Sequence, residues 1–400
     1  MPQFYIEQAE IFQPVFLLKA WKLFFRIKIK SLCFRYFSNI RIPIITPNSN
    51  FVKKSLFETT SIVVISLIFS LQALAQSGGT KTYKFLNLTN SARIAALGGN
   101  FLTIHDHDLS LALANPSLIS SEMNHTLSLN FIDHFAGTSS GFASYGFNLS
   151  KLGNFAATMQ YYSYGKSDNT DVNGETSGKF SAGEYAFNLG WGRMLDSVFS
   201  IGANVKMIYS GLETYNSFGL AVDVAGSYIP NESFCASVLF RNIGRQLTTY
   251  TSVGAEPLPF EIQAGISKRL AHVPFRYSIL LQHIEKWDLS YADPNAVVDP
   301  ITGEIAKESG IDAFANNTMR HIVIGGEFLP AKFLSIRVGF NYLRRQEMKV
   351  VSRPGTVGFS WGFGLKISKF NFSYSRAAYH LTGSPNFISV STNLGDWGKK

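Results

Sequence analysis

Apolar and polar side chains alternate along this chain with a period of two from His125 onward. Over 334–342 and 199–209, apolar residues occupy every second position, and the positions between them hold mostly Ser, Gly, Asn, Arg or Lys. The shorter run 370–375 repeats the pattern. Successive residues of a β-strand point to opposite faces, so each segment has one apolar face and one face of small or polar side chains. Helical spacing fits none of them.

The alternation predicts fourteen strands. Their expected ranges are 125–132, 140–150, 153–162, 180–193, 197–210, 214–229, 232–241, 259–270, 273–286, 318–329, 333–345, 356–368, 369–378 and 386–394.

The connections between these strands alternate between short and long. Short turns are expected at 151–152, 195–196, 230–231, 271–272, 330–332 and 368–369. Longer, polar loops are expected at 163–179, 242–257, 287–317, 346–355 and 379–385. Tight periplasmic turns that alternate with long outer loops are typical of even-stranded barrels in bacterial outer membranes. The predicted fold is therefore all-β: a transmembrane antiparallel β-barrel of about 14 strands, over residues 125–397.

The physical basis of this prediction is the lipid environment. Every backbone N–H and C=O in lipid needs an internal partner, so a spanning sheet must close on itself. Its lipid-facing side chains are then apolar, whereas its lumen-facing side chains are free to be polar. A soluble β-sandwich or barrel also alternates, but its strands are shorter and its loops do not follow this order of lengths. Aromatic residues near the expected strand ends fit the girdles of a membrane barrel: Tyr161, Tyr162, Trp191, Tyr209, Tyr228, Trp287, Tyr342 and Trp361.

Residues 51–75 read as a secretory signal peptide. Lys53 and Lys54 give a positive start, Ile62–Leu71 is an apolar core, and Ala73–Ala75 forms an A-x-A cleavage signal. The apolar run is shorter than the roughly 20 residues of a membrane-spanning helix. We expect the segment to be removed on export.

Residues 1–50 have no evident role ahead of such a signal. We hypothesise that translation starts near Phe51 and that residues 1–50 are a spurious leader; a genuine basic amphipathic leader is the alternative. N-terminal sequencing of the mature protein should give Gln76 or a near neighbour, and recovery of residues 1–50 would contradict the hypothesis.

Composition agrees with a membrane protein. The 400 residues are 46% hydrophobic and 16% charged, against roughly 25% charged in soluble proteins. The net charge is +9, but nine basic and three acidic residues lie within the first 75, which leaves about +3 for the rest. A nucleic-acid partner therefore loses its main support. The two cysteines, Cys33 and Cys235, can build neither a disulfide framework nor a zinc cluster.

Two G-x-S-x-G matches, at 358–362 and 137–141, raise the possibility of a hydrolase. A nucleophile elbow needs a turn from a strand into a helix. The first match, which contains Ser360, lies inside an alternating strand, and the second lies in an expected hairpin loop. No catalytic residue and no cofactor is assigned; an active-site serine probe would test the hydrolase reading.

Potential metal ligands occur in two places. His105–Asp108 reads HDHD, but adjacent residues on an extended segment point to opposite sides and cannot all meet one ion. Gly98–Gly99 lacks the Lys-Ser/Thr that follows in a P-loop. No metal site is assigned. A second group of potential ligands lies in the loop 287–317, but its spacing does not match the EF-hand pattern. We interpret it as a solvated acidic loop. Its members are Asp293, Asn295, Asp299 and Glu304.

Residues 76–124 precede the first strand and are expected to form a plug or a periplasmic segment. A fourteen-stranded barrel has a lumen wider than its own side chains fill. We therefore expect residues 83–122 to fold into the lumen or across its periplasmic mouth, with Arg93, Asp106 and Asp108 hydrogen-bonded to lumen-facing groups. The stretch 108–119 reads as short helical turns. The candidate plug residues are Arg93, Gly98, Gly99, Asp106, Asp108, Asn115 and Pro116.

Several stretches resemble a known family. "SARIAALGGN" (91–100) with "LALANPSLI" (111–119) resembles the N-terminal signature of the PorV/PorQ group, FadL-like outer-membrane barrels of Bacteroidetes. "RNIGRQLTTY" (241–250), "EPLPFEIQAGISKRLAHVPFR" (256–276) and "LQHIEKWDLSY" (281–291) resemble its PorQ branch. The resemblance covers most of 83–397, and residues 1–50 have no counterpart in it.

The resemblance implies a non-enzymatic barrel in the bacterial outer membrane. It implies membership of the type IX protein secretion system, in which such a barrel anchors the cell-surface attachment complex. Its expected partners are outer-membrane lipid and PorZ-like, PorU-like and PorV-like proteins. The alternative is a FadL-like transporter of hydrophobic small molecules. The loops 163–179, 242–257 and 287–317 are the expected docking surface.

Overall fold

The computed structural model describes residues 81–171, 173–252, 254–290, 310–350, 352–353 and 355–397. These belong to the compact unit Leu74–Lys400. The predicted leader (1–50) and signal peptide (51–75) lie outside the described residues, and so do Cys33 and the acidic set of the loop 287–317.

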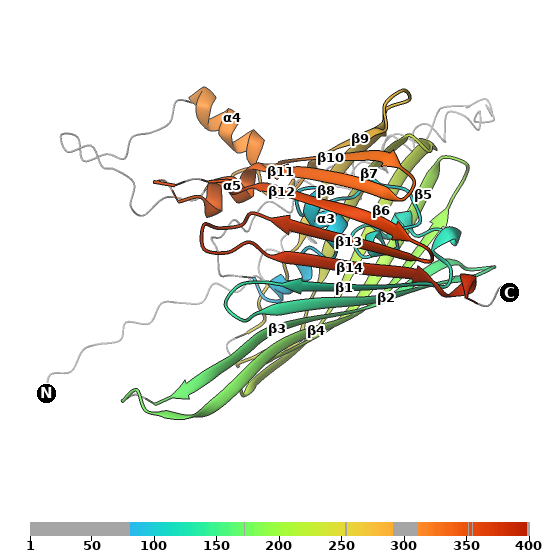
Figure 1. The fold of residues 1–400 in the computed structure, drawn as a ribbon. Coiled ribbons are helices and arrows are strands. Elements are labelled where there is room, and N and C mark those ends of the chain that lie inside the picture. The colour runs from blue at the N-terminus through green and yellow to red at the C-terminus, as the bar shows by residue number, and fades with distance from the viewer. Residues whose placement is uncertain are drawn as a thin grey trace, which may run out of the picture. The chain divides into compact units, whose positions relative to one another are not determined.

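Fourteen antiparallel strands form a closed barrel in which β1 pairs with β14, so the fold predicted from the alternation is confirmed (Figure 1). Closure leaves no sheet edge within the wall. The strands are β1 (Thr126–Asp133), β2 (Ser139–Leu149), β3 (Gly153–Thr170), β4 (Thr176–Met194), β5 (Phe199–Leu212), β6 (Tyr215–Asn231), β7 (Phe234–Thr248), β8 (Glu261–Arg269), β9 (Phe275–Leu281), β10 (Ile322–Ala331), β11 (Leu334–Asn341), β12 (Phe359–Ile367), β13 (Phe370–Ala377) and β14 (Asn386–Asn393).

The two ends of the barrel differ in their connections. The six expected short turns all join an even-numbered strand to the next one, at the end where β1 begins and β14 stops. We call this the short-turn end. The long-loop end carries the connections 249–260, 282–321 and 342–358, with the helices α4 (Gly310–Arg320) and α5 (Tyr342–Met348). No helix among the described residues has the length and apolar character needed to cross a membrane.

Several predicted boundaries at the long-loop end were wrong. Most of the predicted loop 163–179 is strand, because β3 runs to Thr170 and β4 starts at Thr176. Likewise, β7 takes the first part of 242–257. The sequence there is polar because the strands have passed the apolar zone, and backbone pairing needs no apolar face outside it. The predicted strands 318–329 and 333–345 each include helical residues, of α4 and α5 respectively.

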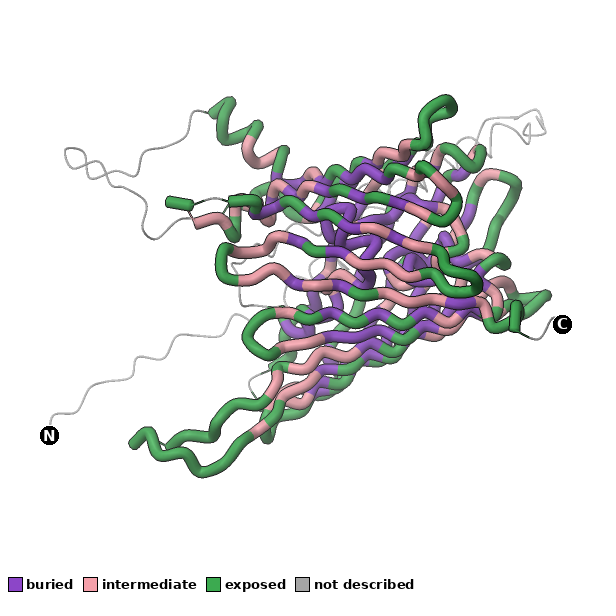
Figure 2. Tube along the Cα trace, viewed as in Figure 1, coloured by how far each residue is buried: buried purple, intermediate pink, exposed green. Residues whose placement is uncertain are grey.

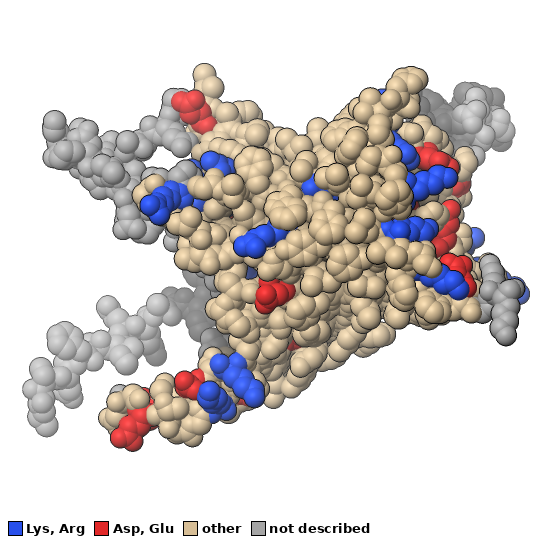
Figure 3. Space-filling view, in the orientation of Figure 1, with Lys and Arg blue, Asp and Glu red and all other residues tan. Residues whose placement is uncertain are grey.

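The wall has the polarity of a soluble protein turned inside out. On β5, Val205, Met207 and Tyr209 are 44–49% exposed, whereas Asn204 and Lys206 between them are at most 2% exposed. Buried positions recur at every second residue along the strands (Figure 2). On the face shown in Figure 3, the central wall is largely free of charged side chains. Apolar outside and polar inside is the arrangement that a barrel in a bilayer requires.

Residues 81–125, which we call the plug, lie inside the barrel. They form short elements: η1 (Lys84–Asn87), α3 (Ala92–Ala96), η2 (Leu109–Leu111), η3 (Pro116–Leu118) and η4 (Ser121–Met123). The plug runs from the long-loop end, where Thr82 N donates to Pro257 O, to the short-turn end, where Asn124 Oδ1 accepts from Asn148 N. Its side chains are mostly buried. The lumen is therefore filled over its length by the segment that precedes β1.

Candidate functional site

Arg93 ties the middle of the plug to the wall through its guanidinium. It makes a bidentate pair with Asp106, with Nη2 donating to Oδ2 at 2.6 Å and Nη1 to Oδ1 at 3.0 Å. Nη1 also donates to Asp108 Oδ2 at 3.1 Å, so all three predicted polar plug residues meet. On its other side, Nε and Nη2 donate to the carboxylate of Glu327 on β10, each at 3.1 Å. The planar guanidinium, with five N–H donors in a rigid fork, serves all three carboxylates and pairs with two of them through two hydrogen bonds each.

Glu327 is shared with two arginines of the neighbouring strands. Arg337 Nε on β11 donates to Oε1 at 2.7 Å, and Arg276 Nη1 on β9 donates to Oε2 at 3.0 Å. Arg276 also lies 3.7 Å from Asp106. Together with Asp108 and Arg93, three cations and three carboxylates form a largely buried cluster with no net charge, which we call the Arg93 cluster. Removing these charges from water is costly, and the mutual attraction and hydrogen bonds of the paired groups offset that cost.

Gly98 and Gly99 end α3 and turn the chain back into the lumen. Both have positive φ, 108° and 97°, and their N–H groups donate to Ala95 O and Ile94 O in the manner of a glycine C-cap. Gly98 O accepts from Arg344 Nη2 at 3.0 Å. The tandem glycines are therefore a structural device at a helix end.

Glycines of the wall mark where the plug touches it. A Cβ placed on Gly339 would lie 2.3 Å from the backbone at Leu97 and Gly98, and one on Gly202 would lie 2.3 Å from Pro116. In contrast, lipid-facing Gly226 has its nearest atom at 4.0 Å. Further wall glycines would meet plug atoms within 3.0 Å: Gly146, Gly190, Gly192, Gly219, Gly325 and Gly362. The plug backbone thus packs against wall positions that are glycines and have no side chain.

Asn115 and Pro116 fix the second half of the plug. Asn115 is fully buried; its Oδ1 accepts from Ser117 N at 3.0 Å and its Nδ2 donates to Leu102 O at 2.7 Å. Pro116 opens η3 directly after this N-cap. Ser117 then contacts Ser227 of β6 through their hydroxyls at 2.6 Å.

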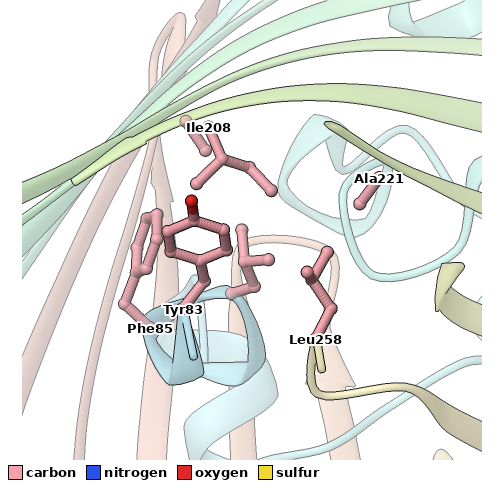
Figure 4. Close-up of a cluster of buried hydrophobic side chains, with 7 residues drawn as sticks. Tyr83, Phe85, Ile208, Ala221 and Leu258 are labelled. Carbon is pink, nitrogen blue, oxygen red and sulfur yellow. The ribbon is translucent and has the colours of Figure 1, made fainter. Parts of the chain in front are cut away.

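The first part of the plug lies in one of several apolar clusters between plug and wall, which we call the apolar compartment (Figure 4). Tyr83, Phe85 and Leu86 of the plug pack on inward-facing wall residues of β4, β5 and β6, and on a residue of the loop 249–260. Two polar contacts hold its ends: Gln160 Nε2 donates to Phe85 O at 2.7 Å, and the Tyr83 hydroxyl bonds to Ser217. The residues that surround it are Ala186, Ile208 and Ala221 of the wall and Leu258 of the loop 249–260.

The other sequence motifs do not gather into a reactive site. Asp106 and Asp108 face Arg93, whereas His107 faces the exposed Glu122, with Nδ1 2.8 Å from its carboxylate. Among the described residues, no group of three His, Cys, Asp or Glu is placed to hold a metal ion. Ser360 lies within β12, and its hydroxyl donates to the plug carbonyl of Ala96 at 3.2 Å.

Sequence reasoning missed the wall half of these contacts. Lys206 and Asp223 form a buried pair at 2.7 Å, and Lys206 also donates to Asn242, which in turn donates to Asn87 of the plug. Lys206, Asp223 and Glu327 lie at inward positions of strands that the alternation predicts. A charged residue at an inward position of such a strand is the signal that could have found them.

No family model and no curated protein matches the sequence. Among solved structures, the chain is similar to a TodX monoaromatic hydrocarbon channel with the deltaS2 mutation, at 12% identity, 77% coverage of this chain and 99% of that chain, and a TM-score of 0.49. It is also similar to the Pseudomonas putida toluene transporter TodX (10%, 76% and 96%, 0.43) and to a Pseudomonas aeruginosa FadL homologue (10%, 76% and 98%, 0.43).

Proposed function

We propose that the protein is a non-enzymatic, plugged barrel of the bacterial outer membrane whose lumen passes small hydrophobic molecules when the first part of the plug moves aside. The inside-out wall supports a location in lipid, and the order of turns and loops supports the outer membrane. The observation that carries the transport proposal is the apolar compartment around Phe85.

The two halves of the plug differ in what holds them. The part around Arg93 is fixed by a buried charge cluster, and loss of one partner there costs about 3–5 kcal/mol. The part around Phe85 is held mainly by apolar burial, which contributes about 1.5–3 kcal/mol per large side chain. A hydrophobic molecule that replaces Phe85 and Leu86 would restore the same burial. The compartment is therefore the place where a small apolar ligand competes with the chain itself.

The test is uptake of N-phenyl-1-naphthylamine by cells that carry the barrel in their outer membrane, because the probe enters phospholipid vesicles without any protein. Replacing both Phe85 and Leu86 by Ser should raise the uptake rate several-fold, because the segment then loses its apolar burial. The matched control replaces outward-facing Leu220 of β6, 38% exposed, by Ser and should leave the rate unchanged. If cells with the parent barrel or the double variant take up the probe no faster than cells without the barrel, the transport proposal is wrong.

A second candidate function is an anchor for the attachment complex of the type IX secretion system. The long motifs shared with the PorV/PorQ group support it, and so does the β3–β4 hairpin, which continues beyond its neighbours at the long-loop end (Figure 1). A rigid scaffold that presents such an element is suited to recognition.

Purification from outer membranes separates the two candidates. Stoichiometric co-purification of a surface protein favours the anchor, whereas a bound apolar molecule without a protein partner favours transport. Each outcome excludes the other function as the main one.

A further inference from the structure

Among the described residues, the β3–β4 hairpin has two strand edges without a neighbour. β3 pairs with β2 only as far as Ser163, opposite Ser139. β4 pairs with β5 only from Ala182, opposite Leu212. Beyond these points the two strands pair only with each other. The unpaired edges are Tyr164–Thr170 on β3 and Thr176–Ser181 on β4.

An unpaired strand edge presents backbone N–H and C=O groups to any other extended chain. The β3 edge is protected: its register shifts between Ser163 and Lys166, and it carries two charged residues. The β4 edge, "TSGKFS", has no proline and a single charged residue, Lys179. Its own register shift, at Ser177, lies next to the hairpin tip and leaves Gly178–Ser181 as a regular edge. The β4 edge is therefore the receptive one.

A pocket of about 370 Å³ lies at the foot of this edge. Phe180 and Ala182 of β4 line it together with Leu212, the last residue of β5, and Tyr215, the first residue of β6. By the two-residue alternation, Phe180 and Ala182 share the face of buried Glu184, so the pocket opens on the lumen side of the hairpin. Tyr215 is 51% exposed, although it stands among apolar neighbours.

We propose that the β4 edge takes up an extended segment of a partner protein by strand addition. The added strand fills the position in the sheet that β5 leaves at Leu212. One of its apolar side chains enters the pocket beside Phe180, so the backbone supplies affinity and the pocket supplies selectivity. This inference rests on the second candidate function, since it names the way a surface partner is held.

The test is single-residue amide hydrogen exchange over 176–181, in the outer-membrane complex and in the purified barrel. Strand addition protects every second amide by at least tenfold in the complex, because alternate N–H groups of an edge strand point outward. Uniform protection of all six amides would overturn the proposal, since it indicates a covered face. Protection already present in the purified barrel and lost on dilution would also overturn it, because the occupant is then a second copy.

Two further outcomes separate this inference from the anchoring function. A partner that co-purifies stoichiometrically while the amides exchange at unchanged rates overturns strand addition and leaves anchoring intact. No partner and unchanged exchange overturns both. Phe180→Ser should weaken partner retention at least tenfold, whereas Leu381→Ser, an exposed apolar residue at the same end of the barrel, should not. Equal retention by the two variants would contradict the role of the pocket.

Discussion

Arg93 links the plug to the wall more closely than any other single side chain in the network around it, because it reaches Asp106, Asp108 and Glu327 together. Replacing it by Met leaves buried carboxylates short of a partner and should weaken plug docking by about 3–5 kcal/mol. Limited proteolysis of the purified barrel should then cut the plug at least a hundredfold faster. Arg93→Lys keeps the charge but not the forked geometry and should fall between the two. A Met variant as resistant as the parent would contradict this role.

Gly339 has no side chain, and the plug backbone lies where its Cβ would be. A methyl group there would lie 2.3 Å from the backbone that follows α3, so Gly339→Ala should push α3 off the wall. Amide exchange over 92–99 should rise at least tenfold. Gly226→Ala on the lipid side, where the nearest atom is 4.0 Å away, should change it less than twofold. Similar effects of the two substitutions would mean that the plug does not bear on the wall at Gly339.

The sequence predicted one side of these contacts. Arg93, Asp106 and Asp108 could be expected to act as hydrogen-bonding plug residues, because charges in a buried segment need partners. Glu327 could not be named as their partner, since nothing in the sequence relates its register to a segment 234 residues earlier. The wall glycines are a further signal in the sequence, because glycine at an inward position of a strand indicates a close approach of another backbone.

At the scale of elements, the strands were easier to predict than the loops. The alternation predicted all fourteen strands, because a lipid-facing row of side chains puts an apolar residue at every second position of each strand. The alternation did not predict the outer parts of β3 and β4, which lie beyond the apolar zone. Backbone pairing there requires no apolar face, so the sequence does not alternate. The prediction of short helical turns over 108–119 agrees with η2 and η3, which Asp108 and Asn115 cap.

The tip of the β3–β4 hairpin offers a pH test at this scale. The N–H groups of Glu175 and Asn173 donate to Asp171 Oδ1 at 2.8 and 2.9 Å, and these hydrogen bonds lower the pKa of Asp171 from its ordinary 3.8. Because the pKa of Asp171 is lower in the folded protein, its ionised carboxylate stabilises the turn above about pH 4. This stabilisation is lost as the pH falls through the pKa that Asp171 has in the folded protein. Amide exchange at Asn173 and Glu175, corrected for intrinsic rates, should accelerate only below that pH. An onset near neutrality would contradict the assignment.

For the whole molecule, the polar inner face of the wall and the plug that fills the lumen are related features. Polar side chains at inward positions would face water in an empty barrel, but here many of them bond to the plug. Lys206 and Asp223 reach the plug through Asn242, and Glu327 bonds directly to Arg93. We therefore expect the barrel to be closed in its resting state, whichever function it serves.

Single-channel conductance in planar bilayers tests this claim most directly. The parent barrel should show almost no conductance, whereas deletion of residues 83–122 should give a large, stable open state. A gel shift between boiled and unboiled samples would establish that the deletion variant still folds as a barrel. A parent that conducts as freely as the deletion variant would contradict the account.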